Sequence, residues 1–291
     1  MGNIHTGMMS CARLWFVVIL VALWPRVASA QGGPPLMTDD PDTPGPNHWE
    51  INLAMLLETS RLERRIDTPR LDFNFGLGRR IQLKFEVPWV SVRDEDNKIQ
   101  SGTGNAVAGV KWRFVGQEGT RIAWSIYPQL EFNTAHGSVV KGIVEDGRQF
   151  LLPTELTVEF VHAEINGEVG RNFVEGRPDN WMFGVSTEGS VTKRMELLGE
   201  LHAEEIPREG AELFVNIGAR PKLTRQIILL LAAGRTVHSP PSVGRRAYLY
   251  LGLQFNLPGQ YAFKHVNRRN TDARISRRAR IPSAANSPAS S

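Results

Sequence analysis

Cysteine is nearly absent from this sequence. Among its 291 residues there is one, Cys11, and it stands ahead of an apolar run near the N-terminus. If that run belongs to a cleaved signal, the remaining chain has no thiol. Disulfide bonds and thiolate metal sites are then excluded, and a thiol-free chain suits an oxidising compartment.

Residues 1–30 have the layout of a secretory signal peptide. Arg13 precedes the apolar run Leu14–Trp24, and the triplet Ala28–Ala30 supplies the small residues that signal peptidase recognises. The run is shorter than the roughly twenty apolar residues that a membrane-spanning helix needs. We therefore expect export and a mature chain that begins at Gln31. A short N-terminal anchor helix is the alternative.

Long apolar runs and catalytic motifs are both missing from the rest of the sequence. After residue 30 no apolar run approaches helix-spanning length, so a chain that crosses a membrane must do so with β-strands. The metalloprotease, hydrolase-elbow, phosphate-loop and dinucleotide-binding patterns are absent, and no two histidines stand at ligand spacing. We therefore expect no enzymatic activity, no cofactor and no metal site.

The positive charge of the sequence is poorly placed for binding nucleic acid. The formal net charge is +4, yet the basic excess lies in the arginine-rich segment beyond residue 261. Between residues 31 and 261 the acidic residues outnumber the basic ones. A terminal block of like charge is typical of a solvated, disordered tail. We therefore expect no nucleic-acid partner.

The sequence is rich in alternation with a period of two. In the segment IQLKFEVPWV, which begins at Ile81, apolar residues alternate with Gln82, Lys84 and Glu86. Such a period indicates a strand and not a helix. Twelve alternating or wholly apolar segments occur, at residues 48–57, 71–77, 81–90, 106–114, 122–132, 150–160, 163–173, 181–187, 195–201, 213–219, 227–233 and 247–255.

The connections between these segments alternate between long and short. The long ones are residues 58–70, 93–105, 133–149, 174–180, 203–212 and 236–246, and the short ones are 78–80, 115–121, 161–162, 188–194 and 221–226. Outer-membrane barrels have long external loops and short periplasmic turns. We therefore predict an all-β fold, a closed antiparallel transmembrane β-barrel of about 12 strands with periplasmic termini. A soluble periplasmic all-β protein is the competing interpretation, because it also alternates but turns its apolar face inward.

The predicted organisation has four parts. They are a signal peptide (1–30), an irregular periplasmic lead-in (31–47), the β-barrel (48–256) and a disordered basic tail (257–291). The lead-in, QGGPPLMTDDPDTPGPN, is rich in proline, glycine and aspartate, as irregular segments are. The tail is first arginine-rich and then rich in serine, alanine and proline, a composition that cannot form a packed core.

The polar residues of the alternating segments are the candidate functional residues. In a barrel they face the lumen, because a basic side chain facing lipid costs about 2–4 kcal/mol at the membrane midplane. The predicted lumen-lining residues are Glu50, Asn52, Asp72, Asn74, Lys84, Glu86, Lys111, Arg113, Tyr127, Gln129, Glu131, Glu155, Glu159, Glu164, Glu168, Glu196 and Glu200. They either line a path for polar or cationic solutes or pair into a charged network that fills the barrel.

Several blocks of the sequence resemble one known family. These are DDPDTPGPNHWEINLA, LDFNFGLGRRIQLKFEVPWV, GVKWRF, YPQLEF, LLPTEL, NGEVGRNFV and ELLGELH. Together they resemble the family named for the MetA pathway of phenol degradation, from about Thr38 to Phe255. The resemblance implies an outer-membrane barrel that transports small, aromatic or hydrophobic molecules.

The sequence therefore predicts a channel or transporter in the cell outer membrane, with passive passage through a polar lumen. Its expected partners are outer-membrane lipid, a small-molecule solute and the barrel-assembly machinery, and it needs no cofactor. The first alternative is a structural or ligand-binding outer-membrane barrel with a plugged interior. The second is the soluble periplasmic binding protein.

Overall fold

The computed structural model describes residues 33–61, 63–117, 120–160 and 163–259. The expected signal peptide lies outside these residues, as does the expected basic tail from residue 260 onward. The description that follows therefore concerns the lead-in and the predicted barrel.

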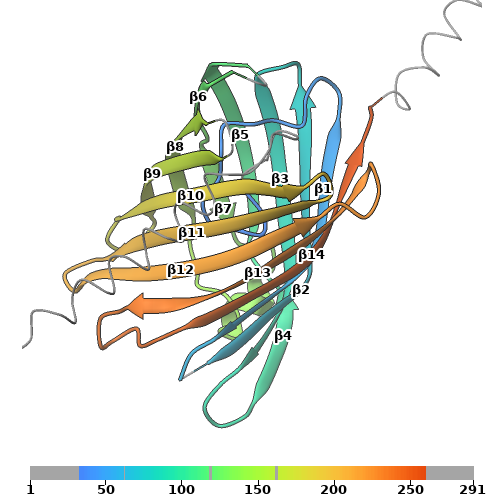
Figure 1. Cartoon of the computed structure of the whole chain (residues 1–291). Helices are drawn as coiled ribbons and strands as arrows, with labels where there is room; N and C mark the ends of the chain where they lie inside the picture. Colours follow the sequence, from blue (N-terminus) through green and yellow to red (C-terminus); the bar gives the residue numbers. More distant parts are fainter. Residues whose placement is uncertain (1–32, 62, 118–119, 161–162, 260–291) are drawn as a thin grey trace, which may run out of the picture. The chain divides into compact units, whose positions relative to one another are not determined.

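Strands make up most of the described chain (Figure 1). They are β1 (Trp49–Thr59), β2 (Arg64–Leu77), β3 (Ile81–Arg93), β4 (Ile99–Thr103), β5 (Ala106–Val115), β6 (Ile122–Ile126), β7 (Gln129–Phe132), β8 (Gln149–Glu159), β9 (Glu164–Val174), β10 (Asn180–Thr192), β11 (Met195–Ile206), β12 (Gly210–Pro221), β13 (Ile227–His238) and β14 (Ala247–Leu257). A short helix, α2 (His136–Val140), lies between β7 and β8. None of the helices in the described residues has the length and apolar character to cross a membrane.

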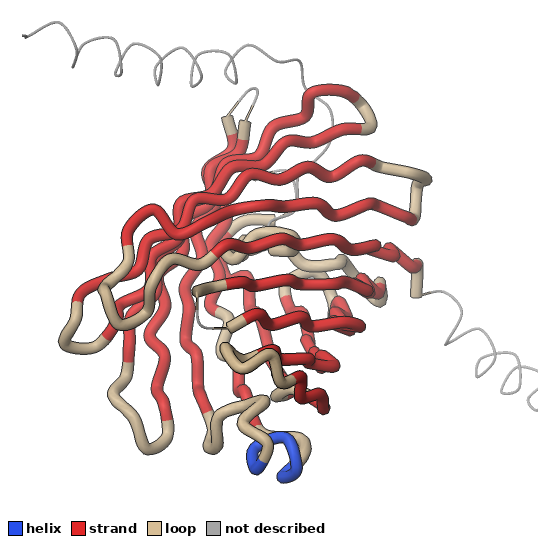
Figure 2. The backbone as a smooth tube through the Cα atoms, turned by 90° about the horizontal axis from the view of Figure 1, so that it is seen from below, coloured by secondary structure: helices blue, strands red, loops and turns tan. Residues whose placement is uncertain are grey.

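The sheet closes on itself. Strands that lie side by side in the wall pair antiparallel, and β1 pairs with β14 as well as with β2. β3 pairs with both β4 and β5, and β8 pairs with both β6 and β7, so each of these short pairs forms a single strand of the wall. The predicted closed antiparallel barrel of twelve strands is thus confirmed, and Figure 2 shows its curved wall from a second side.

The two interrupted wall strands break at residues that disturb a ladder. β4 and β5 are separated by Gly104 and Asn105, and β6 and β7 by Tyr127 and Pro128. Proline has no N–H to donate within a sheet. The carbonyl of Pro128 nevertheless accepts from the amide of Val110 at 3.0 Å. The chain therefore stays in the wall across this break.

At the end of the barrel where β1 finishes, several strands extend further than the alternation predicted. β2 begins at Arg64, within the predicted loop 58–70, and β11 and β12 occupy most of the predicted loop 203–212. Near these ends the residues are polar on both faces, so apolar and polar residues no longer alternate, although the hydrogen bonds between the strands continue. The predicted difference in connection length is correspondingly smaller, and 133–148 is the longest connection that remains.

The alternation separates an apolar outer face from a polar interior. On β14, Leu251 is 45% exposed on the outside, whereas its neighbour Tyr250 is 5% exposed on the inside. Lys111 and Glu155 are almost completely buried on the inner face. A soluble barrel has the opposite arrangement, with apolar residues in the core and charges in water. The distribution is that of a barrel whose outer face meets lipid.

This assignment predicts a depth-dependent cost for charge on the outer face. Leu251→Arg, halfway along β14, should destabilise the lipid-embedded barrel by about 2–4 kcal/mol, whereas Leu257→Arg at the strand end should cost about 0–1 kcal/mol. The measurement is urea unfolding of the protein refolded in lipid vesicles, followed by tryptophan fluorescence. Equal and negligible costs at both positions would show that the outer face meets water.

Candidate functional site

The structure places every predicted lumen-lining residue on the inner face. Those that are buried are Asn52, Asp72, Asn74, Glu86, Lys111, Arg113, Tyr127, Glu155, Glu164, Glu168, Glu196 and Glu200. Those that are half-buried are Glu50, Lys84, Gln129, Glu131 and Glu159. Their function is not fixed by this placement, and it depends on what else occupies the lumen.

The lumen holds the segment Gly33–Asn47, which we call the plug. The sequence indicated a periplasmic lead-in outside the barrel, and the contacts of this segment with the inner face correct that prediction. The plug has no regular structure, so its backbone polar groups need side-chain partners when they are buried. The wall supplies those partners at the start, the middle and the end of the plug.

Arg220 on β12 binds the start of the plug. Its Nη2 donates to the carbonyl oxygen of Gly33 at 3.1 Å and to that of Pro34 at 2.9 Å. Its Nη1 donates to Glu188 Oε2 on β10 at 2.8 Å. Both side chains of this ion pair are buried. Arg220 therefore joins the wall charge of Glu188 to the plug backbone.

Two wall carboxylates accept backbone N–H groups from the middle of the plug. Glu200 on β11 accepts from Met37 at 3.2 Å and also from Thr38. Glu168 on β9 accepts from Asp39 at 3.0 Å. Hydrogen bonds from N–H groups to ionised carboxylates are among the stronger ones in proteins. The middle of the plug is thus held between two neighbouring sectors of the wall.

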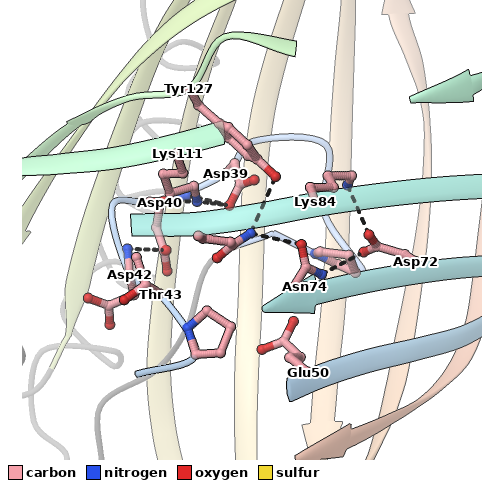
Figure 3. Close-up of a pocket in the computed structure, with 13 residues that line it drawn as sticks. Asp39, Asp40, Asp42, Thr43, Glu50, Asp72, Asn74, Lys84, Lys111 and Tyr127 are labelled. Carbon is pink, nitrogen blue, oxygen red and sulfur yellow. Dashed lines mark hydrogen bonds and ion pairs between the residues drawn. The ribbon is translucent and has the colours of Figure 1, made fainter. Parts of the chain in front are cut away.

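The acidic residues of the plug contact two basic residues of β5, of which Figure 3 shows Lys111 beside Asp39 and Asp40. Lys111 Nζ lies 2.9 Å from Asp39 Oδ1 and also donates to the carbonyl oxygen of Asp40. Arg113 Nη1 lies 2.6 Å from Asp42 Oδ1. Both basic side chains are at most 4% exposed. The plug thus provides carboxylates for two buried cations of the wall.

The apolar part of the plug contacts an apolar patch inside the barrel. This apolar patch consists of Ala54, Leu56, Leu198, Leu230, Ala232, Tyr248 and Tyr250. Leu36 is buried in the same cluster, and Met37 packs against it. The Tyr248 hydroxyl donates to the carbonyl oxygen of Pro35 at 2.9 Å. The inner face is therefore not uniformly polar, and the plug matches its apolar sector.

Two wall glycines make room for the plug. A Cβ atom at Gly184 on β10 would overlap the side chain of Thr38, and one at Gly76 on β2 would overlap the carbonyl oxygen of Gly45. Glycine in a strand often marks such a close approach of another segment. The wall sequence is thus fitted to the plug at both of these contacts.

A small cavity lies between the plug and the wall, lined in part by Asp40, Asp72, Lys84 and Tyr127 (Figure 3). Its volume is about 20 Å³, which holds about one water molecule. At this place, toward the end of the barrel at which β1 begins, the plug therefore packs closely against the wall.

A large cavity, which we call the vestibule, lies toward the other end. Its volume is about 1870 Å³, above the roughly 300–1,000 Å³ of ordinary small-molecule pockets. Its charged wall residues are Glu58, Arg65, Asp67, Arg70, Glu86, Glu131, Glu204 and Arg246. Arg65 Nε lies 2.9 Å from Asp67 Oδ1, and Arg70 Nη2 lies 2.5 Å from Glu86 Oε1. The vestibule is thus a polar space large enough for a small organic solute.

The connection 133–148 forms one side of the vestibule. Ile143 is 2% exposed, and its carbonyl oxygen accepts from Arg65 Nη1 at 3.2 Å. Asn133 donates to the carbonyl oxygen of Glu145 at 2.8 Å, which ties the two ends of this connection together. The connection therefore folds back against the wall.

The sequence prediction missed several buried lumen residues. Glu188, Arg220 and Glu212 lie one residue beyond the predicted strand ends. Continuing the inward alternation through Ser186 to Glu188 would have included the first of them. Glu212 also forms an ion pair with Arg246 across the vestibule end. The signal was present in the parity, and only the assumed strand ends concealed it.

The described residues contain no group of three or more histidine, cysteine, aspartate or glutamate side chains that could hold a metal ion. Asp39 and Asp42 of the plug instead contact Lys111 and Arg113. These carboxylates therefore act through ion pairs.

Comparison with known proteins identifies the fold. No protein-family profile and no curated protein matches the sequence. Among solved structures, the COG4313 outer membrane channel from Pseudomonas putida F1 superposes with a TM-score of 0.64 at 11% identity, over 76% of this chain and 100% of that one. The KdgM porin in complex with disordered oligogalacturonate superposes with a TM-score of 0.51 at 10% identity, over 71% and 98%. The chain thus has the fold of outer-membrane channel barrels.

The Arg220 contacts predict which change loosens the plug. Arg220→Met leaves Glu188 buried without its cation, which should cost about 3–5 kcal/mol, and removes the donors for two plug carbonyls. Arg220→Met/Glu188→Leu should recover most of that stability without restoring the plug. The measurements are the urea midpoint and the hydrogen exchange of the Met37 and Thr38 amides. Full amide protection in the double variant would contradict the anchoring role of Arg220.

Proposed function

We propose that this protein is an outer-membrane channel or transporter through which small solutes pass passively. The observation that carries the proposal is the vestibule, a cavity of about 1870 Å³ inside a barrel whose outer face is apolar. A solute that enters it meets charged and amide side chains that can replace its hydration. The apolar outer face provides the contact with lipid.

The arrangement of the lumen corresponds to a closed state of such a channel. The vestibule admits the solute, and the plug blocks its way at the end where β1 begins. The cavity that Asp40 and Lys84 line between plug and wall has a volume of about 20 Å³, far below the size of an organic molecule. Passage therefore requires that the plug withdraws from Glu200, Lys111 and Arg220. Its backbone has no regular structure, and the one hydrogen bond that it forms with a strand backbone among the described residues joins the Asn47 amide to the carbonyl oxygen of Gly76, at the last residue of the plug. Withdrawal of the residues before Asn47 therefore breaks mainly contacts that involve side chains.

The remaining parts of the proposal come from the sequence. The signal peptide, the periplasmic termini and insertion by the barrel-assembly machinery all fit an outer-membrane location. The resemblance to the family named for the MetA pathway of phenol degradation favours aromatic or hydrophobic solutes. The apolar patch with Tyr248 and Tyr250 supports that class, because it offers an apolar surface inside the lumen. Passive passage needs neither cofactor nor catalytic residue.

The second candidate is a structural or ligand-binding barrel whose interior stays plugged. The observation that favours it is the number of wall elements that hold the plug. Strands β5, β9, β11, β12 and β14 all donate hydrogen bonds to the plug or accept them from it. In this alternative the vestibule would be a binding pocket with one opening.

Removal of the plug separates the two candidates. Deletion of residues 33–46 should convert a protein with almost no current in a planar bilayer into one with a stable open conductance, because the filled end of the lumen is vacated. Heat-modifiable migration on a gel verifies that the deleted form is folded. Lys98→Met, on an exposed connection, serves as a control and should conduct no more than the unaltered chain. A folded deletion form without current would rule out the channel.

A further inference from the structure

The plug presents two different chemical groups to the wall within a short stretch of chain. Leu36 is buried against the apolar patch, and Asp39 contacts Lys111. Three residues of extended chain span at most about 10–11 Å. An apolar surface and a buried cation of the wall are therefore both reached by one short, amphipathic and anionic stretch.

The wall cations depend on carboxylates from the plug. Arg113 is 4% exposed; its Nη1 contacts Asp42, its Nη2 donates to the carbonyl oxygen of Arg79 at 2.8 Å, and its buried Nε has no partner. Lys111 has one wall carboxylate, Glu155, at 3.4 Å, and reaches Asp39 at the shorter distance of 2.9 Å. When the plug withdraws, Arg113 loses the carboxylate of Asp42 and Lys111 keeps Glu155. This part of the wall then offers two cations to another anion.

The wall accepts an anion here despite its overall acidic excess. Glu155, Glu164, Glu168 and Glu200 are all buried on neighbouring strands. The carboxylates of the plug nevertheless lie among them, at the two basic residues of β5. The local ion pairs therefore outweigh the surrounding charge, and another carboxylate can use the same positions.

We propose that the plug is an intramolecular stand-in for the solute, and that the vacated lumen binds an amphipathic carboxylate. The carboxylate takes the places of Asp39 and Asp42 at Lys111 and Arg113. Its apolar part takes the place of Leu36 on the apolar patch. This inference rests on the proposed channel function, and it names the class of solute that the same lumen admits.

Binding to the barrel without residues 33–46 tests the inference directly. Isothermal titration in detergent should show saturable binding of 4-phenylbutyrate, at least about tenfold tighter than that of 4-phenylbutylamine, which has the same shape and the opposite charge. The full chain, in which the plug occupies the site, should bind 4-phenylbutyrate at least about tenfold more weakly and also controls for uptake by the micelles.

Matched arginine variants locate the site within the deleted form. Arg113→Met should weaken 4-phenylbutyrate binding about tenfold, whereas Arg93→Met, at an exposed position on β3, should leave it unchanged. Equal affinity for the acid and the amine, or binding that is insensitive to Arg113→Met, would overturn the inference. A deleted form that conducts ions but does not bind the acid would overturn it while leaving the channel intact. A folded form without current would instead contradict the channel itself.

A second test uses the full chain, in case the deletion form does not fold. Asp42→Ala removes the carboxylate from Arg113 and should lower the temperature at which the heat-modifiable band shifts. Sodium acetate should restore that temperature in the variant, and sodium chloride at the same ionic strength should not. The unaltered chain should show no such response to acetate. Identical effects of the two salts on the variant would count against a carboxylate site.

Discussion

The closed antiparallel ladder is the constraint on which the rest of this structure depends. In a strand, successive side chains point to opposite faces, so one register decides the surroundings of every residue. Because the ladder also closes from β1 to β14, no strand can slip without moving apolar residues inward and charges outward. The outer face is therefore mostly apolar, and the buried charges of the wall face the lumen.

Because the charged side chains face the lumen, many of them are buried there and need partners of opposite charge. Buried charges are tolerated when they are paired and hydrogen-bonded. Part of the pairing is made within the wall, as between Lys84 and both Asp72 and Glu86. Another part is made by the plug, whose carboxylates reach Lys111 and Arg113. The plug is thus a component of the electrostatic design of the barrel as well as an obstruction in it.

The sequence alone was enough to predict the wall but not the contents of the lumen. Alternation is a local property, so Glu155 and Lys111 could be assigned to the inner face without knowledge of their partners. The position of the plug depends on contacts between residues that are far apart in sequence, such as Arg220 with Gly33. Its prolines, glycines and aspartates indicate irregular structure equally well inside and outside a barrel. Only the apolar pair Leu36 and Met37 hinted at a buried location.

Strand ends were the other limit of prediction. At the ends of β2 and β11 that extend beyond the apolar part of the outer face, residues such as Arg64 and Glu205 make both faces polar. The alternation of apolar and polar residues disappears there, although the hydrogen bonds between the strands continue. Glu188, Arg220 and Glu212 were missed because the predicted strands stopped one residue short of them, although the inward parity continues. The bounds of a strand are thus harder to predict than the face on which its residues lie.

The path of the plug has a topological consequence. It contacts Arg220 near the last residues of β12 and, further along, Gly76 near the last residues of β2. Both strands finish at the end of the barrel where β1 begins, so the plug forms a loop whose two ends lie at the same end of the barrel. Such a loop can enter or leave a closed barrel without a free chain end passing through it. The barrel wall can therefore close before the plug enters the lumen.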